Sequence, residues 1–169
     1  LDHEVLSKYP VLFLSNSTCL SDAQCEQIRK YVEDGGTLIA TYETSLMDEL
    51  GKVRNTFALA DVFGVDYDVG TFVHEFRHPW QIAPKRGITL VPHDEVLKEE
   101  FGYIIAFGAT SCEIVLGQDS AATVLATKST YQTSPPADVT AAKQTFANFR
   151  PDRNYDSGEP AVTMNHFGK

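Results

Sequence analysis

Residues 9–65 decide the fold, and they read YPVLFLSNSTCLSDAQCEQIRKYVEDGGTLIATYETSLMDELGKVRNTFALADVFGV. Near their start, residues 11–14 form an apolar run without polar alternation, which is typical of a strand covered on both faces of a parallel sheet. Residues 37–41 form a second run of β-forming residues. The order strand, helix, strand predicts a right-handed crossover between two parallel neighbours.

The segment between the two runs carries the start and stop signals of a helix. Ser21 followed three residues later by Gln24 predicts a capping box. The double glycine Gly35-Gly36 ends the helix, because glycine accepts the left-handed conformation at a helix C-terminus without steric cost. Three apolar residues recur on one helical face, which places them in the core: Cys25, Ile28 and Val32.

The rest of the chain predicts further short elements. A short helix is expected over residues 45–51, and another over residues 55–65 with Gly64 at its end. Turn residues separate β-like runs at residues 88–91, 103–107, 113–116 and 122–127. The pattern predicts an α/β fold with a mainly parallel sheet and helices on both faces. We expect residues 1–169 to form a single domain that is one piece of a longer, multi-domain chain.

Composition excludes several classes of function. The chain has 169 residues, of which 43% are hydrophobic and 22% charged, as in ordinary globular domains. The formal net charge of −9 argues against a nucleic acid or an anionic membrane as partner, because phosphates repel an acidic surface. Three irregularly spaced cysteines form no disulfide framework and no zinc ribbon. We expect no cofactor, and the cytoplasm as the compartment.

Several segments resemble the β-galactosidase trimerisation domain, which follows the catalytic barrel in glycoside hydrolase family 42. The resemblance lies in residues 9–14, 20–21, 31–41, 48–49, 59–65 and 158–169. It implies a flavodoxin-like fold similar to that of class I glutamine amidotransferases. It also implies a domain that packs against neighbouring subunits and helps to enclose the active site of the barrel. The catalytic glutamates belong to the barrel, and no residue of this chain matches their motif.

Ligands of open α/β sheets bind beyond the carboxyl ends of the strands, so chemistry is sought first at residues 15–18, which include Asn16, and 42–45. In amidotransferases the second of these places is an elbow that holds a cysteine nucleophile. The equivalent position here is Tyr42 or Glu43, with small neighbours that suit an elbow but no thiol. Amidotransfer is therefore not expected. A small-ligand binder, or an enzyme with another nucleophile or a metal at this elbow, remains an alternative.

A second motif is a literal His-Glu-x-x-His between His74 and His78. On a helix it would place two imidazoles on one face for zinc, with Glu75 as general base. Pro79 follows directly and disfavours helical geometry at His78, so a zinc hydrolase is the weakest alternative. One other interpretation is a structural strand or loop with Phe72 and Phe76 packed inward. Another is a loop near a sugar site or a subunit contact, in which His78 and Trp80 stack or form hydrogen bonds.

The sequence thus predicts a non-catalytic accessory and oligomerisation domain of a glycoside hydrolase. We expect self-association, and contact with carbohydrate only through the parent hydrolase, with Asn16, His74, His78 and Trp80 as the residues closest to a ligand.

Overall fold

The computed structural model describes residues 2–68, 88–101, 104–106, 112–129 and 156–168. These residues form two compact units. One contains residues 2–68, 112–123 and 163–168, and the other contains residues 88–101, 104–106, 124–129 and 156–162. Each unit has its own sheets and is described separately below. Among the described residues, no helix has the length and apolar character needed to cross a membrane.

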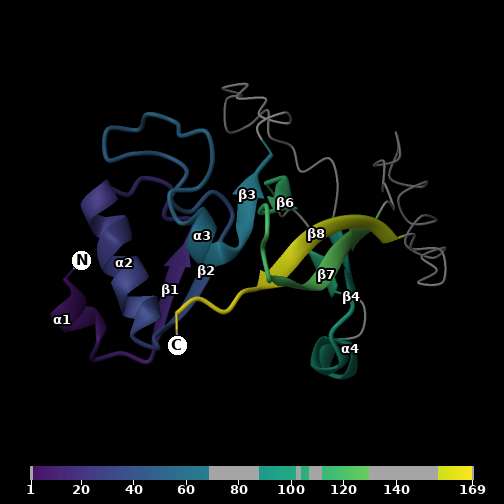
Figure 1. The fold of residues 1–169 in the computed structure, drawn as a ribbon. Coiled ribbons are helices and arrows are strands. Elements are labelled where there is room, and N and C mark those ends of the chain that lie inside the picture. Colours follow the sequence, from purple (N-terminus) through teal and green to yellow (C-terminus); the bar gives the residue numbers. More distant parts are fainter. Residues whose placement is uncertain (1, 69–87, 102–103, 107–111, 130–155, 169) are drawn as a thin grey trace, which may run out of the picture. The chain divides into compact units, whose positions relative to one another are not determined.

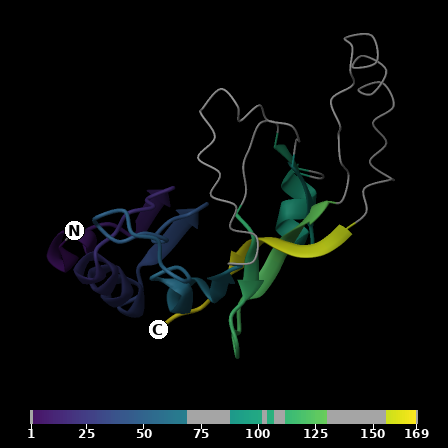
Figure 2. The ribbon, with the colours of Figure 1, turned by 90° about the horizontal axis from the view of Figure 1, so that it is seen from above.

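The first unit is built around a parallel pair of strands. Strand β1 (Val11–Ser15) leads into helix α2 (Asp22–Glu33), which returns the chain to strand β2 (Thr37–Thr41). The two strands pair in parallel from Val11 opposite Thr37 to Ser15 opposite Thr41. Figures 1 and 2 show α2 running alongside the pair. The predicted crossover between two parallel neighbours is confirmed.

Helix α2 begins and ends as its residues predict. Ser21 Oγ accepts a hydrogen bond from the Gln24 backbone N–H, while Gln24 Oε1 accepts one from the Ser21 N–H at 2.9 Å. Gly35, just past the helix, has a φ of +98°, which glycine adopts freely. The inner face of α2 packs on the strand pair in one core cluster of buried residues: Leu14, Leu20, Cys25, Ile28, Leu59 and Val62.

The contribution of the capping box to stability can be tested by substitution. We expect Ser21→Ala to lower the free energy of unfolding by about 1 kcal/mol, because the Gln24 N–H loses its acceptor. Chemical denaturation followed by circular dichroism measures the change. Ser7→Ala is the control, since that exposed hydroxyl only donates to the Glu4 carbonyl, and a cost of about 0.5 kcal/mol or less is expected. Equal costs for the two variants would contradict the role of the box.

Four further elements and one core cluster complete the first unit. Helix α1 (His3–Leu6) packs near α2, and helix α3 (Ala60–Phe63) leads through Gly64 into strand β3 (Val65–Tyr67). Strand β3 pairs antiparallel with β6 (Ile114–Leu116). The second core cluster consists of Leu46, Phe57, Val65 and Tyr67. The Phe57 and Tyr67 rings meet edge to face, with centroids 5.6 Å apart.

The second unit contains one four-stranded sheet in the order β5-β4-β7-β8. Its strands are β4 (Ile88–Pro92), β5 (Ile104–Ala106), β7 (Thr123–Ser129) and β8 (Asp156–Met164), and helix α4 (Glu95–Phe101) follows β4. β4 pairs antiparallel with both β5 and β7. Thr127 Oγ1 donates to Asp156 Oδ1 at 2.6 Å and lies 2.8 Å from His93 Nε2, which fastens the ends of β4, β7 and β8 together.

The fold is mixed α/β, but its sheets differ from the prediction. Only β1 and β2 are parallel among the described pairs, whereas β3–β6, β4–β5 and β4–β7 run antiparallel. Between β4 and β5 the sequence has only 11 residues, fewer than the dozen or more that a parallel crossover takes, so this neighbouring pair runs antiparallel. The predicted helix over residues 45–51 is wrong, and the one over residues 55–65 is limited to Ala60–Phe63.

Candidate functional site

The carboxyl ends of β1 and β2 form a rim where the backbone takes an uncommon conformation three times. Asn16, Tyr42 and Ser45 have φ angles of 50°, 56° and 66°. Residues other than glycine rarely adopt positive φ, and each instance costs of order 1–3 kcal/mol, so it persists only where surrounding structure holds it. Because Ser15 pairs with Thr41, Asn16 and Tyr42 follow directly at the same edge of the sheet. The rim therefore has the sharp turns of an elbow.

Two hydroxyl residues hold this backbone in place. The Thr44 side chain donates to the Leu14 or Thr41 carbonyl and accepts from the Ser17 N–H at 3.2 Å. Ser45 is fully buried, and its Oγ accepts from the Leu59 N–H at 3.3 Å. The Ser45 N–H donates to the Ser17 carbonyl. Both hydroxyls are buried and form hydrogen bonds with backbone groups, so they hold the backbone around the rim.

Acidic and aromatic groups surround the elbow residue. Cys112, seventy residues further along the chain, donates its thiol to the Tyr42 carbonyl at 3.2 Å. Burial, followed by the negative charge of Glu43, raises the pKa of Tyr67 to about 12. A phenol held neutral in this way donates hydrogen bonds and does not act as a base at neutral pH. The Tyr67 phenol beside the rim is therefore held as a neutral hydroxyl at neutral pH.

The predicted site residues divide into two groups. Asn16, Tyr42 and Glu43 lie together at the rim, with Asn16 exposed and the other two half-buried. His74, His78 and Trp80 lie outside the described residues, so the zinc motif and the sugar-contact loop stay predictions. Within the described part of the chain, no group of three or more histidine, cysteine, aspartate or glutamate side chains is placed to hold a metal ion.

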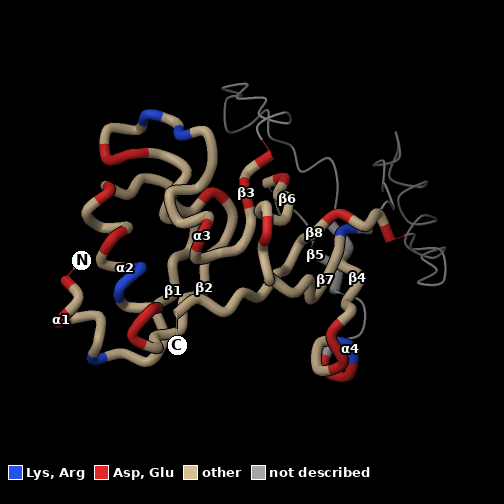
Figure 3. Tube along the Cα trace, viewed as in Figure 1, with Lys and Arg blue, Asp and Glu red and all other residues tan. Residues whose placement is uncertain are grey.

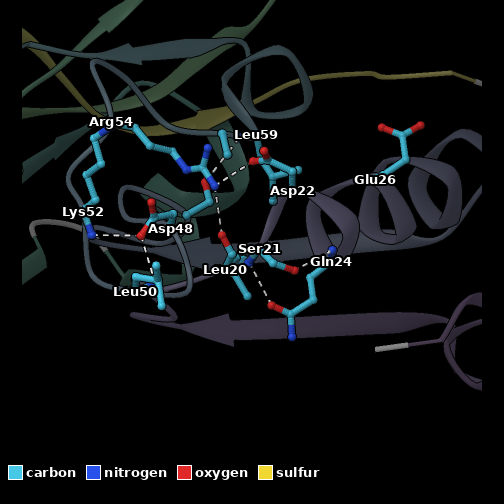
Figure 4. A network of polar contacts seen from close by, with 12 residues as sticks. Leu20, Ser21, Asp22, Gln24, Glu26, Asp48, Leu50, Lys52, Arg54 and Leu59 are labelled. Atoms are coloured by element: carbon cyan, nitrogen blue, oxygen red, sulfur yellow. Dashed lines mark hydrogen bonds and ion pairs between the residues drawn. The ribbon is translucent and has the colours of Figure 1, made fainter.

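Residues 47–55 follow the rim along the chain and form a loop that is held by several hydrogen bonds. The Asp48 carboxylate accepts from the Leu50 and Lys52 N–H groups, both at 2.9 Å, and the Asp48 N–H donates to the Lys52 carbonyl (Figure 4). Met47 forms isolated β-bridges with Cys19 on one side and Val53 on the other. We call residues 47–55 the Asp48 loop.

Arg54 fastens the Asp48 loop to the start of α2. Its guanidinium donates to the Leu20 carbonyl at 3.1 Å and pairs with Asp22 at 2.7 Å (Figure 4). A shallow hollow of about 250 Å³ lies beside this contact. Its lining residues are Asp48, Lys52, Val53, Arg54 and Asn55. The loop is thus a preformed surface feature, although it belongs to no helix or regular strand.

We expect the order of this loop to depend on pH through the Asp48 carboxylate. The N–H groups of Lys52 and then Leu50 hold the pKa of Asp48 below its ordinary value of 3.8. A lowered pKa contributes stability above the unfolded value and loses it as pH falls through the folded value. We therefore expect the Leu50 and Lys52 amides to stay protected from hydrogen exchange above pH 4 and to lose protection only in stronger acid. NMR exchange measures this, and Asp48→Asn, the uncharged control, should remove the pH dependence.

Sequence reasoning missed the residues that organise this end of the unit. It assigned Asp48 to a short helix, whereas the Asp-x-x-Gly spacing also fits a side chain that bonds its own downstream backbone. That competing signal was available in residues 48–51. The neighbours of the elbow, Cys112 and Tyr67, carry no local signal, because only the tertiary fold brings them to Tyr42.

The comparisons with known proteins agree with this geometry. The family model described as the β-galactosidase trimerisation domain matches residues 2–142. No curated protein matches the chain.

A β-galactosidase from Bacillus circulans sp. alkalophilus is similar in structure, with a TM-score of 0.61 at 18% identity over 96% of this chain and 19% of that one. Two further solved structures agree. A β-galactosidase from Rahnella sp. R3 has a TM-score of 0.56 at 18% identity, over 96% of this chain and 19% of its own. A catalytic mutant of a GH42 β-galactosidase from G. stearothermophilus has a TM-score of 0.56 at 18% identity, over 96% of this chain and 18% of its own.

The chain thus has the fold of an α/β domain that occurs within GH42 β-galactosidases. The chain belongs to the β-galactosidase trimerisation domain family. It spans less than a fifth of the length of the solved enzymes that it resembles.

Proposed function

We propose that this chain is a non-catalytic domain of a glycoside hydrolase and that its role is self-association. The observation that carries the proposal is the family match over residues 2–142, because the family is described by its role in trimerisation. The rim supports the non-catalytic part. At the elbow the nucleophile position holds Tyr42 or Glu43, and the neighbouring hydroxyls of Thr44 and Ser45 are engaged by backbone groups.

The same match supports a proposal for the parent activity. We propose a β-galactosidase-like hydrolase as the parent, with its catalytic carboxylates outside this chain. In that setting the β1–α2–β2 unit is the start of a larger flavodoxin-like sheet. The rim with Asn16, Tyr42 and Glu43, together with His74, His78 and Trp80, is the part of this domain closest to bound sugar.

Sedimentation velocity over a concentration series of the full chain tests the central part of this proposal. We expect the weight-average sedimentation coefficient to rise with concentration, because mass action favours association. The buffer should contain at least 0.15 M salt, since a net charge of −9 makes copies repel one another at low ionic strength. A coefficient that corresponds to one 18.7 kDa chain at every concentration would contradict self-association.

A small-ligand site at the rim is the second candidate function, and the cluster of positive φ angles at Asn16, Tyr42 and Ser45 favours it. Its test is an NMR titration of the chain with galactose. Saturable shifts of the Asn16 and Tyr42 amides that disappear in Glu43→Gln would support the site. Shifts that stay linear with sugar concentration in both proteins would exclude it.

A further inference from the structure

We propose that the Asp48 loop is the surface by which this chain docks on a second copy of itself. The inference rests on the proposed function and adds the place of contact. Residues 47–55 display Leu50 with 89% of its surface exposed and Val53 with 37% exposed. The hollow lined by Lys52, Arg54 and Asn55 lies directly beside them. The loop thus offers a partner an exposed apolar tip with a hollow beside it.

The loop is rigid before any partner arrives. Asp48 accepts two backbone N–H groups, Met47 bridges to both neighbouring segments, and Arg54 bonds to Leu20 and Asp22. The first unit thus holds the backbone of Leu50 in place, and no described residue covers the side chain. Such order lowers the conformational entropy lost on association, so a preformed loop binds better than a mobile one.

Charge points to a second copy as the partner. The chain carries a net charge of −9, so two copies repel each other over most of their surface. The Asp48 loop is locally neutral, because Lys52 and Arg54 balance Asp48 and Glu49. Figure 3 shows both signs side by side on the loop that precedes α3. Arg54 is paired with Asp22, so Lys52 is the exposed cation that the loop offers to the acidic surface of another copy.

The geometry favours a head-to-tail contact. A loop that projects an apolar tip and a lysine is not complementary to itself, so it meets a different, acidic patch on the next copy. Heterologous contacts of this kind close into rings when the rotation permits, and a trimer is the smallest such ring.

Sedimentation equilibrium of the full chain tests the surface with two matched substitutions. Leu50→Asp places a charge at the loop tip, whereas Val5→Asp places the same charge on α1, where Val5 is 49% exposed. Both side chains lie in water, so neither substitution is expected to disturb the fold, which circular dichroism checks. We expect Leu50→Asp to raise the dissociation constant for self-association about tenfold or more, as for a central contact residue, and Val5→Asp to leave it unchanged.

The outcomes separate the two proposals. If wild type and Leu50→Asp associate with equal affinity, the docking surface is wrong and the proposed function stands. If Val5→Asp weakens association as much as Leu50→Asp, the effect is one of net charge, and the docking surface is likewise overturned. A wild-type chain that remains monomeric overturns both the surface and the function.

Discussion

Gly64→Ala is expected to lower the free energy of unfolding by about 2–5 kcal/mol, since it combines backbone strain with overpacking. Gly64 ends α3 with a φ of +70°. A Cβ at this position would lie 2.8 Å from both Ala122 Cβ and Ser120 Oγ, and 2.9 Å from Asn165 Cγ. These contacts come from two distant parts of the chain, so the backbone cannot relax away from one without meeting another.

The same glycine is also a centre of hydrogen bonds. Its carbonyl accepts from Ser120 Oγ at 2.6 Å and from the Gly117 N–H at 3.1 Å. Asn165 Nδ2 donates to the carbonyls of Asp61 and Val62 at the end of α3. A shift of the backbone at Gly64 would lengthen all of these bonds, which places the expected loss toward the upper part of the range.

Gly51→Ala is the matched control for this prediction. Gly51 has a φ of +82°, but a Cβ there would meet nothing within 4 Å. It therefore isolates backbone strain, for which a loss of about 1–2 kcal/mol is expected. Urea denaturation of both variants measures the difference. If Gly64→Ala proves no more destabilising than Gly51→Ala, the close packing of residues 120–122 and 165 around Gly64 is refuted.

Gly36→Ala is the second substitution with a large expected effect. A Cβ on Gly36 would lie 2.3–2.5 Å from three ring atoms of Tyr31. That ring is 3% exposed, and its hydroxyl donates to the Tyr9 carbonyl at 3.0 Å, with the Thr37 carbonyl 3.3 Å away. Since the ring cannot move without losing these bonds, we expect a loss of about 2–4 kcal/mol in thermal or chemical unfolding.

The neighbouring glycine and a double mutant test the cause of that loss. Gly35 has a φ of +98° and open space around it, so Gly35→Ala measures strain without collision. In the Tyr31→Leu background the obstacle at Gly36 is removed, so Gly36→Ala should cost less than in wild type by about 1 kcal/mol or more. Additive effects of Tyr31→Leu and Gly36→Ala would show that the ring is not the reason for the glycine.

The part of the fold that the sequence predicts best is the part whose signals are local. The capping box at Ser21, the apolar face of α2 and the double glycine all act within a few residues, and each one is present in the structure. The parallel pairing of β1 and β2 follows because a helix between two adjacent strands leaves few other arrangements.

The direction of the other strands could not be predicted in the same way. Strands of three residues such as β3, β5 and β6 have too little periodicity to indicate a partner, and β3 pairs with a strand that begins almost fifty residues later. The helix predicted over residues 45–51 is absent for another reason. Residues 45–51 have helix-like composition, but the left-handed φ of Ser45 and the two amides taken by Asp48 favour a bonded turn.

In the candidate site, too, some features could be predicted from local signals and others depend on the tertiary fold. Position alone predicts that Asn16, Tyr42 and Glu43 share the rim, because they follow two paired parallel strands. What the rim does chemically depends on Cys112, Tyr67 and the hydroxyls of Thr44 and Ser45, whose contacts appear only when the chain is folded. These contacts favour a structural elbow over a catalytic one.

Native mass spectrometry of the full chain shows whether the chain self-associates, because it counts the copies in each assembly. We expect a species of three chains that grows with protein concentration and is depleted in Leu50→Asp but not in Val5→Asp. A spectrum with only single 18.7 kDa chains at all concentrations would refute self-association.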